Sequence, residues 1–221
     1  MSAAAPFPLP DRDCPLCPRL AGFRTAQRQA HAEWHNAPVP PFGDPSAELL
    51  IVGLAPGLRG ANRTGRPFTG DYAGDLLYAT LAKFGFTTGG YGGHAGDGLA
   101  LRGARITNAV RCVPPQNRPE PAEIRACGRF LATEFAAAPS VRVILALGAI
   151  AHNAVLAAKG LRRAAYPFSH AGMHALPDGA LLADSYHCSR LNTNTGTLTT
   201  EMFEAVFEAI AEVLGRPTLS A

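Results

Sequence analysis

The run VRVILALG at residues 141–148 constrains the fold more than any other segment of this sequence. A strand with one solvent-exposed face alternates apolar and polar residues, whereas this run is apolar throughout after Arg142. Continuous apolar character is typical of a strand that is covered on both faces. We therefore expect residues 141–148 to form a central strand of a parallel sheet.

Further apolar runs alternate with helical patterns along the chain. We expect strands at residues 48–53, 105–112 and about 180–185, and helices at 18–34, 72–84, 119–137, 149–159 and 199–214. This alternation indicates right-handed crossovers. It predicts an α/β fold with a mostly parallel, about four-stranded central sheet flanked by helices.

The composition fits one globular unit. With 221 residues, of which 47% are hydrophobic and 17% charged, the chain can bury a sizeable core. We expect a single domain at 13–215, a disordered Pro- and Ala-rich N-terminus at 1–12 and a tail at 216–221, with the glycine-rich residues 89–98 as a long mobile surface loop.

The charge is mildly basic, at a formal +3, and all basic side chains except Lys83 and Lys159 are arginines. Arginine suits bidentate binding of phosphate, although codon bias would give the same composition. We find no run of about 20 apolar residues and no secretory signal. We therefore expect no membrane span and a cytoplasmic location.

The five cysteines are an odd number, and in a reducing compartment they are not expected to form a disulfide framework. Four of them have the spacing C-x2-C-x94-C-x14-C, formed by Cys14, Cys17, Cys112 and Cys127. Four thiolates suit either zinc or an iron-sulfur cluster, and spacing alone does not separate the two. Each cysteine taken singly is more often a core residue, and we expect Cys188 to be one.

Two loops combine glycine with polar residues. The first spans residues 53–75 and contains GLAPG at 53–57 and NRTGRPFTGD at 62–71. It follows a predicted strand, where open α/β sheets hold their ligands. It matches neither GxxxxGK[ST] nor GxGxxG, which disfavours a zinc-bound nucleotide-binding enzyme. The second loop is YHCSRLNTNTG at 186–196.

Together with TNAVRC at 107–112 and the four cysteines, these motifs resemble the uracil-DNA glycosylase superfamily, and they are most similar to its family 5 (type B) branch. The resemblance covers residues 14–203. It implies a three-layer αβα sandwich and a 4Fe-4S cluster on Cys14, Cys17, Cys112 and Cys127. We expect this cluster to be architectural and to tie the N-terminal segment and the loop after Cys112 to the DNA-facing side.

The activity implied by the resemblance is hydrolysis of the N-glycosidic bond of a damaged base, uracil, in DNA. We expect other deaminated bases such as hypoxanthine to be accepted as well, because no bulky residue visibly guards the C5 side of the base pocket. The base would be flipped out of the duplex and an abasic site left behind. Lys83 and Lys159 lie outside the motifs, so we expect a monofunctional enzyme without a lyase step. We also expect a monomer. GLAPG offers no carboxylate after its first glycine, which leaves a noncatalytic, damage-sensing nucleic-acid-binding protein as the alternative.

Three residues are implied to be catalytic. His187 would donate a hydrogen bond to the base oxygen, and Asn108 would read the base edge. Asp71 would orient the attacking water or stabilise the cationic sugar. Each residue also has an ordinary structural use: a histidine bonded to backbone, an Asx cap at a strand end, or a helix N-cap.

The remaining implied residues bind the base or the DNA backbone. The base pocket is formed by Gly53, Leu54, Ala55, Phe68 and Asn108. Phe68 would stack on the flipped base, although core packing would explain it too. Leu191 would wedge into the vacated base step. Neutral donors would come from Asn192, Thr193 and Asn194, and backbone contacts from Arg63, Arg66, Arg111 and Arg190.

Overall fold

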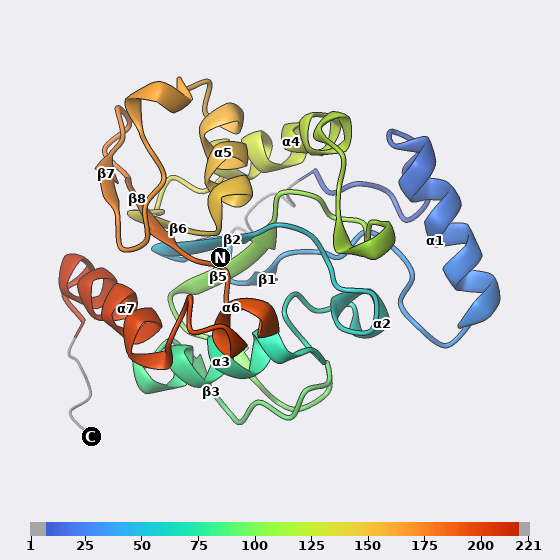
Figure 1. Ribbon diagram of the computed structural model, residues 1–221, viewed down its shortest axis with the longest axis horizontal. Coiled ribbons are helices and arrows are strands. Elements are labelled where there is room, and N and C mark those ends of the chain that lie inside the picture. The colour runs from blue at the N-terminus through green and yellow to red at the C-terminus, as the bar shows by residue number, and fades with distance from the viewer. Residues whose placement is uncertain (1–7, 217–221) are drawn as a thin grey trace, which may run out of the picture.

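The computed structural model describes residues 8–216 and has a six-stranded sheet at its centre (Figure 1). The strand order is β1-β5-β2-β6-β8-β7. The strands are β1 (Phe42–Gly43), β2 (Leu49–Gly53), β5 (Ala104–Asn108), β6 (Val143–Leu147), β7 (Met173–Ala175) and β8 (Leu181–Ser185). The four central strands are parallel, and β1 and β7 pair antiparallel at the two edges.

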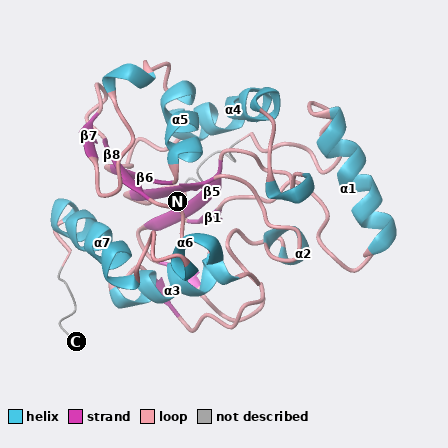
Figure 2. Ribbon diagram, in the orientation of Figure 1, coloured by secondary structure: helices cyan, strands magenta, loops and turns pink. Residues whose placement is uncertain are grey.

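Helices cover both faces of the sheet (Figures 1 and 2). They are α1 (Pro18–Ala30), α2 (Ala61–Thr64), α3 (Tyr72–Lys83), α4 (Pro121–Ala136), α5 (Ala149–Ala158), α6 (Arg190–Asn194) and α7 (Thr200–Leu214). Two 3-10 turns, Pro115–Asn117 and Arg163–Ala165, and a small hairpin of β3 (Thr87–Thr88) with β4 (Ala100–Leu101) complete the elements. Helices α4 and α5 lie on one face, and α3 and α7 lie on the other.

The alternation of side chains along β2 and β6 builds these three layers. Leu49 and Ile51 pack with α3 and α7, whereas Leu50 and Val52 pack with α5. All of these side chains have no exposed surface, because both faces of the sheet are covered. The predicted αβα sandwich and the central position of β6 (Val143–Leu147) are therefore confirmed.

The expected strand count of about four is too low, because the sheet has six strands. The two missed strands, β1 and β7, have only two and three residues. A run this short does not establish a period of two, and it forms here because the edges of the parallel core offer unpaired backbone groups.

Two helices differ from their predicted bounds for local reasons. Helix α1 ends at Ala30 instead of Trp34, because Asn36 turns back and donates its side-chain amide to the carbonyls of Gln27 and His31. Helix α4 begins at Pro121, where Glu120 and Glu123 form a reciprocal capping box.

The glycine-rich residues 89–98 are fastened to the body of the protein. Asp97 accepts hydrogen bonds from the backbone of Gly92 and Leu99 at 2.8 and 3.0 Å, and it forms an ion pair with Arg66. Tyr91 stacks on Tyr78 with 4.6 Å between ring centroids. The prediction of a mobile loop did not take these contacts into account. Asp97 and Tyr91 fix residues 89–98 to the rest of the protein despite the many glycines.

Both ends of the described chain also make contacts. In the predicted disordered segment 1–12, the carbonyl of Arg12 accepts from Arg28 at 2.9 Å, and residues 1–7 lie outside the described part. Arg216, the first residue of the expected tail, packs over Phe86, and residues 217–221 are likewise outside it. Within residues 8–216, no helix combines the length and apolar character needed to cross a membrane.

Candidate active site

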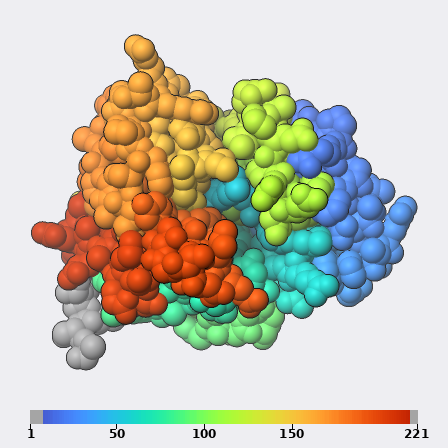
Figure 3. Space-filling model, viewed as in Figure 1, coloured from blue at the N-terminus to red at the C-terminus, as the bar shows by residue number. Residues whose placement is uncertain are grey.

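The loops that follow β2, β5 and β8 meet at the carboxyl edge of the sheet, as expected for parallel strands. Gly53 and Asn108 are register partners at the ends of β2 and β5. The pairing continues beyond the strands, because Ala109 donates to the Gly53 carbonyl and Val110 to the Leu54 carbonyl, both at 2.9 Å. Figure 3 shows the orange-red surface of α6 beside the cyan surface around α2 on one face of the molecule.

Asn108 lies at the centre of this edge with 2% of its surface exposed. Its Oδ1 is buried and has no hydrogen-bond partner among the described residues. A buried acceptor left unsatisfied costs free energy, so it is found where a ligand or water completes it. The Asx cap considered above would use this oxygen, and the structure shows no such hydrogen bond.

Gly53, Phe68 and Asn108 pack so closely that a side chain at position 53 has no room. A Cβ there would lie 2.4 Å from Asn108 Oδ1 and 2.6 Å from Phe68 Cζ. The glycine is therefore required by the close approach of an amide and an aromatic ring. Ala55, two residues further on, packs against the neighbouring apolar cluster that contains Leu20.

Phe68 is held in the left-handed backbone region, at φ 51°. This conformation is uncommon for a bulky residue and is often found at functional sites, where surrounding contacts impose it. The phenol of Tyr91 donates to the Phe68 carbonyl at 3.3 Å, and Gly74 packs against the same carbonyl, where a Cβ would be 1.9 Å away. The loop is thus fixed from two sides and presents a rigid ring.

His187 approaches Phe68 from the loop after β8. The two ring centroids are 6.0 Å apart with 29° between the planes. Burial lowers the pKa of His187 to about 4, because the surroundings disfavour a charged imidazolium. The ring is therefore neutral at pH 7 and carries one N–H donor.

Asp71 caps α3 and faces the GLAPG loop. Its Oδ1 accepts from the backbone of Gly74 at 3.3 Å, which is the capping role expected from its position. Its Oδ2 lies against Gly57 and Gly60, where Cβ atoms would approach to 2.9 and 2.2 Å. Burial raises the pKa of Asp71, which strengthens it as a base.

The start of α3 and the loop that carries His187 are in direct contact. The thiol of Cys188 donates to the carbonyl of Ala73 at 3.5 Å, and the Arg190 guanidinium lies 5.4 Å from the centroid of the Tyr72 ring. These contacts bring Asp71 and His187 to one flank of the protein. Cys188 is fully buried, in agreement with the packing role expected for it.

Three of the predicted DNA-binding residues lie on the surface of this flank. Leu191 is 70% exposed on α6, and Arg63 and Arg190 are exposed. Asn192 uses its side-chain amide to donate to the His187 carbonyl at 2.8 Å, so it holds the loop. An exposed leucine next to an exposed arginine is suited to a contact with a nucleic acid.

Arg66 lies inside the protein, where it does not reach a DNA backbone. It is 5% exposed and forms two hydrogen bonds of 2.8 and 2.6 Å to the carboxylate of Asp97. Its guanidinium also lies 5.1–5.8 Å from the ring centroids of Phe42, Tyr78 and Tyr91. Arg66 thus supports the loop that presents Phe68.

Arg111 is also an internal residue, with 1% of its surface exposed. It donates to Glu134 at 2.5 Å, and the same carboxylate accepts from Arg105 and Thr107 at 2.7 and 2.9 Å. This network fixes β5 against α4. The expected phosphate contact of Arg111 does not fit this position.

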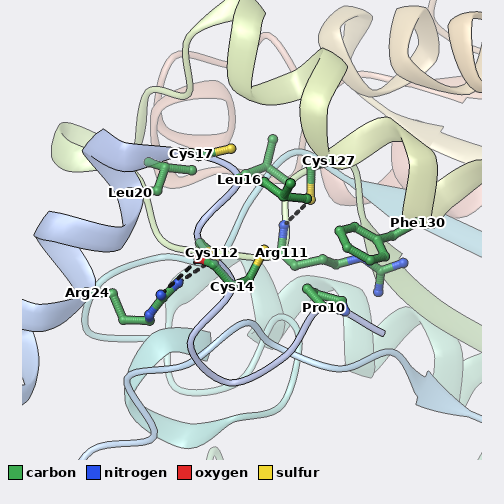
Figure 4. Close-up of a pocket in the computed structure, with 11 residues that line it drawn as sticks. Pro10, Cys14, Leu16, Cys17, Leu20, Arg24, Arg111, Cys112, Cys127 and Phe130 are labelled. Carbon is green, nitrogen blue, oxygen red and sulfur yellow. Dashed lines mark hydrogen bonds between the residues drawn. The ribbon is translucent and has the colours of Figure 1, made fainter. Parts of the chain in front are cut away.

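The four cysteines Cys14, Cys17, Cys112 and Cys127 line one cavity, together with Leu20, Phe130 and other residues (Figure 4). The structure therefore brings together the cysteines that the spacing grouped. Burial raises the pKa of Cys17 and of Cys112 to about 11. Burial also raises the pKa of Cys127 above its ordinary value. A metal that binds these thiols must displace their protons.

Arg24 supplies positive charge to this cavity. It is 4% exposed and donates to Cys112 Sγ at 3.5 Å and to the carbonyl of Cys14 at 3.0 Å. Its Nε has no hydrogen-bond partner within residues 8–216. The backbone N–H of Arg111 donates to Cys127 Sγ at 3.3 Å. A buried cation and N–H donors directed at sulfur suit thiolates that carry negative charge, as in an iron-sulfur centre.

Comparison with known proteins agrees with the fold and the clustered motifs. Residues 40–211 match the Uracil DNA glycosylase superfamily, and the chain belongs to this superfamily. Within it, the chain is similar to a type-5 uracil-DNA glycosylase of Thermus thermophilus, with 50% identity over 202 residues. The aligned region covers 89% of this chain and 92% of the relative.

A type-5 uracil-DNA glycosylase of Pyrobaculum aerophilum is 39% identical over 213 residues, or 95% of this chain and 89% of the relative. The similarity to a type-4 uracil-DNA glycosylase of Archaeoglobus fulgidus is shorter, at 38% over 109 residues, 48% of this chain and 47% of the relative. The predicted similarity to the family 5 branch is confirmed.

Proposed function

We propose that this protein is a monofunctional uracil-DNA glycosylase that hydrolyses the N-glycosidic bond of uracil in DNA and leaves an abasic site. The observation that carries the proposal is the buried, unpartnered Oδ1 of Asn108 beside Phe68, at the edge where Asp71 and His187 also converge. The names of the type-5 relatives support it.

Asn108 and Phe68 would select and hold the base. The amide Oδ1 is available to accept from the N3–H of uracil, and the amide nitrogen would donate to its O4, whereas cytosine presents the opposite pattern. The rigid ring of Phe68 would stack on the face of the base. Uracil would supply a hydrogen-bond donor to this buried acceptor, which no protein group satisfies within the described residues.

His187 would assist departure of the base. Cleavage of the glycosidic bond develops negative charge on the base, which a preorganised donor in a dry site stabilises. The low pKa of His187 keeps the ring neutral, so it donates a hydrogen bond without first taking up a proton. Loss of one donor of this kind costs about 10²–10³ in kcat.

Asp71 would act on the sugar side of the bond. Its burial strengthens its interaction with a developing oxocarbenium ion, and its raised pKa also suits it to orient and deprotonate the attacking water. Lys83 and Lys159 form ion pairs with Glu204 and Asp178 on other elements. Neither lysine is therefore positioned to form the Schiff base of a lyase.

The surface around α6 would open the duplex. Leu191 would enter the vacated base step, at a cost of roughly a few kcal/mol of unstacking, while Arg63 and Arg190 bind the backbone. If Leu191→Ala excised uracil equally well from paired and single-stranded DNA, the wedge would be refuted. Ile150→Ala, which shortens an exposed apolar side chain on α5, is the matched control.

The four cysteines would hold a 4Fe-4S cluster. A cluster binds each thiolate through a different iron. The buried Arg24 guanidinium and the Arg111 N–H, which donate to the sulfurs of Cys112 and Cys127, suit such charged thiolates. The cluster would join the segment before α1 to the loop after β5, and we assign it an architectural role.

The proposal also has finer features. The protein would act as a monomer in the cytoplasm, with residues 13–215 as one glycosylase domain, and would also accept hypoxanthine. A panel of oligonucleotides with single lesions tests the range of bases.

The activity itself is tested by incubation with a uracil-containing duplex, followed by alkaline cleavage of abasic sites. With the wild type, we expect the DNA strand to be cleaved at the uracil position after alkali and to remain intact before alkali. Asp71→Asn and Asp71→Ser separate chemistry from capping, since serine also caps helices. If Asp71→Ser excises uracil as well as the wild type, Asp71 serves only the helix.

A further inference from the structure

A second group of possible metal ligands lies away from the cysteines, between α5 and the strands β7 and β8. It consists of His152 on α5, His174 on β7 and Asp184 on β8, and one ligand atom from each lies within 4.8 Å of the others. Within residues 8–216, this is the one group of at least three histidine, cysteine or carboxylate side chains whose ligand atoms lie this close together. The resemblance and the proposed glycosylase chemistry use none of these residues.

The ligand atoms of the three side chains lie close to one another. His152 Nδ1 is 2.7 Å from Asp184 Oδ1, and His174 Nε2 is 3.4 Å from Asp184 Oδ2. His174 Nε2 and Asp184 Oδ2 are buried and face each other at this distance without meeting the geometry of a hydrogen bond. A buried carboxylate oxygen held in this way has capacity for a further ligand.

The second nitrogen of His152 supports a ligand role. His152 Nε2 is 2.8 Å from the carbonyl of Tyr166, which accepts its N–H. This arrangement places a proton on Nε2, so the proton between Nδ1 and Asp184 Oδ1 is the one that a metal ion must displace. Metal-binding histidines commonly donate their other ring N–H to a backbone carbonyl in this way.

We propose that His152, His174 and Asp184 form a binding site for one divalent metal ion of the zinc class. Two imidazole nitrogens and one carboxylate oxygen suit zinc and cobalt(II), which take such ligands at about 2.0–2.2 Å. The side chain of His174 is 17% exposed, so the ion enters there and a water completes the coordination. Binding displaces the proton shared between His152 Nδ1 and Asp184 Oδ1.

The bound ion links three elements behind the candidate active site. Asp184 lies three residues before His187 on the same chain segment, and α5 begins after Gly148, where a Cβ would be 3.5 Å from His187 Cβ. The metal joins α5 and the edge strand β7 to β8. It therefore stabilises the strand and helix that position the His187 loop, and it takes no part in the chemistry.

The test is a titration of the purified protein with cobalt(II) chloride. The protein keeps the metal centre that its four cysteines hold. We expect one additional equivalent per chain, with the visible bands of cobalt bound by nitrogen and oxygen and without sulfur-to-cobalt charge transfer. Zinc should displace the cobalt. His174→Ala should weaken the apparent Kd at least about tenfold, since loss of outer-shell partners alone costs 10–100-fold.

Two further variants keep the result interpretable. His94→Ala removes an exposed histidine from the loop at 89–98 and should leave the cobalt titration unchanged. Asp184→Asn keeps a polar partner for His152 and should also weaken binding, so it replaces His174→Ala if that variant fails to fold. The proposal is overturned if cobalt does not bind in excess, or if the wild type and both site variants bind it equally. In that case His152 and Asp184 form an ordinary histidine–carboxylate pair, with His174 packed beside it.

Discussion

His187→Gln tests the claim that the protein holds a neutral imidazole at the candidate active site. The variant keeps a side-chain N–H donor of similar length but removes the titrating ring. Burial lowers the pKa of His187 to about 4 in the folded protein, whereas the ring has an ordinary pKa of 6.5 when the chain is unfolded. The two states therefore bind different numbers of protons between these pH values.

The direction and size of the effect follow from this difference. Above pH 6.5 the ring is neutral in both states, and its contribution to stability is fully present. As the pH falls toward 4 the unfolded chain takes up the proton first, so the folded state loses stability. One pKa unit corresponds to about 1.4 kcal/mol, so the loss is at most about 3 kcal/mol, less any screening of this half-buried ring by water.

The assay is urea unfolding of the wild type and the variant at pH 7 and near pH 4. We expect the wild type to lose up to about 3 kcal/mol more than His187→Gln over this range. His94→Gln, in an exposed loop, should behave like the wild type. Equal losses in the wild type and His187→Gln would show that the ring is not held neutral, and would refute a neutral donor at this position.

Three other substitutions have defined outcomes. Asn108→Leu should lower uracil excision at least about tenfold without loss of stability, because it removes a buried unpartnered acceptor; a matching loss of folding in thermal melts would contradict this. Gly60→Ala should displace the Asp71 carboxylate and reduce kcat, whereas Gly128→Ala has open space and should not. Asp97→Asn should cost about 3–5 kcal/mol in denaturant unfolding by leaving a buried guanidinium unpaired, and a cost below 1 kcal/mol would refute that account.

The central sheet could be predicted because its strands repeat one signal. Each of β2, β5 and β6 is five residues long and fully buried, and residues 141–148 show this as an apolar run. The place of the candidate site was predicted from topology, since parallel strands present their carboxyl ends at one edge. The edge strands β1 and β7 carry no comparable pattern, because their pairing is decided by the neighbouring strand.

The arginines show where the sequence alone was insufficient. Arg63 and Arg66 lie in the same motif, yet Arg63 is exposed and Arg66 is buried. Their difference depends on Asp97, which is 31 positions from Arg66 and lies among glycines that suggest mobility. Arg111 likewise depends on Glu134, 23 positions away. A local motif does not reveal a partner that only the fold brings near.

The most direct measurement is a crystal structure of the protein with duplex DNA that carries a uridine analogue whose glycosidic bond resists hydrolysis. The proposed function predicts an extruded uracil stacked on Phe68, with the Asn108 amide on its pairing edge, His187 at a base oxygen and Leu191 in the vacated step. A uracil that remains stacked in the duplex, or that binds at another face of the protein, would contradict it.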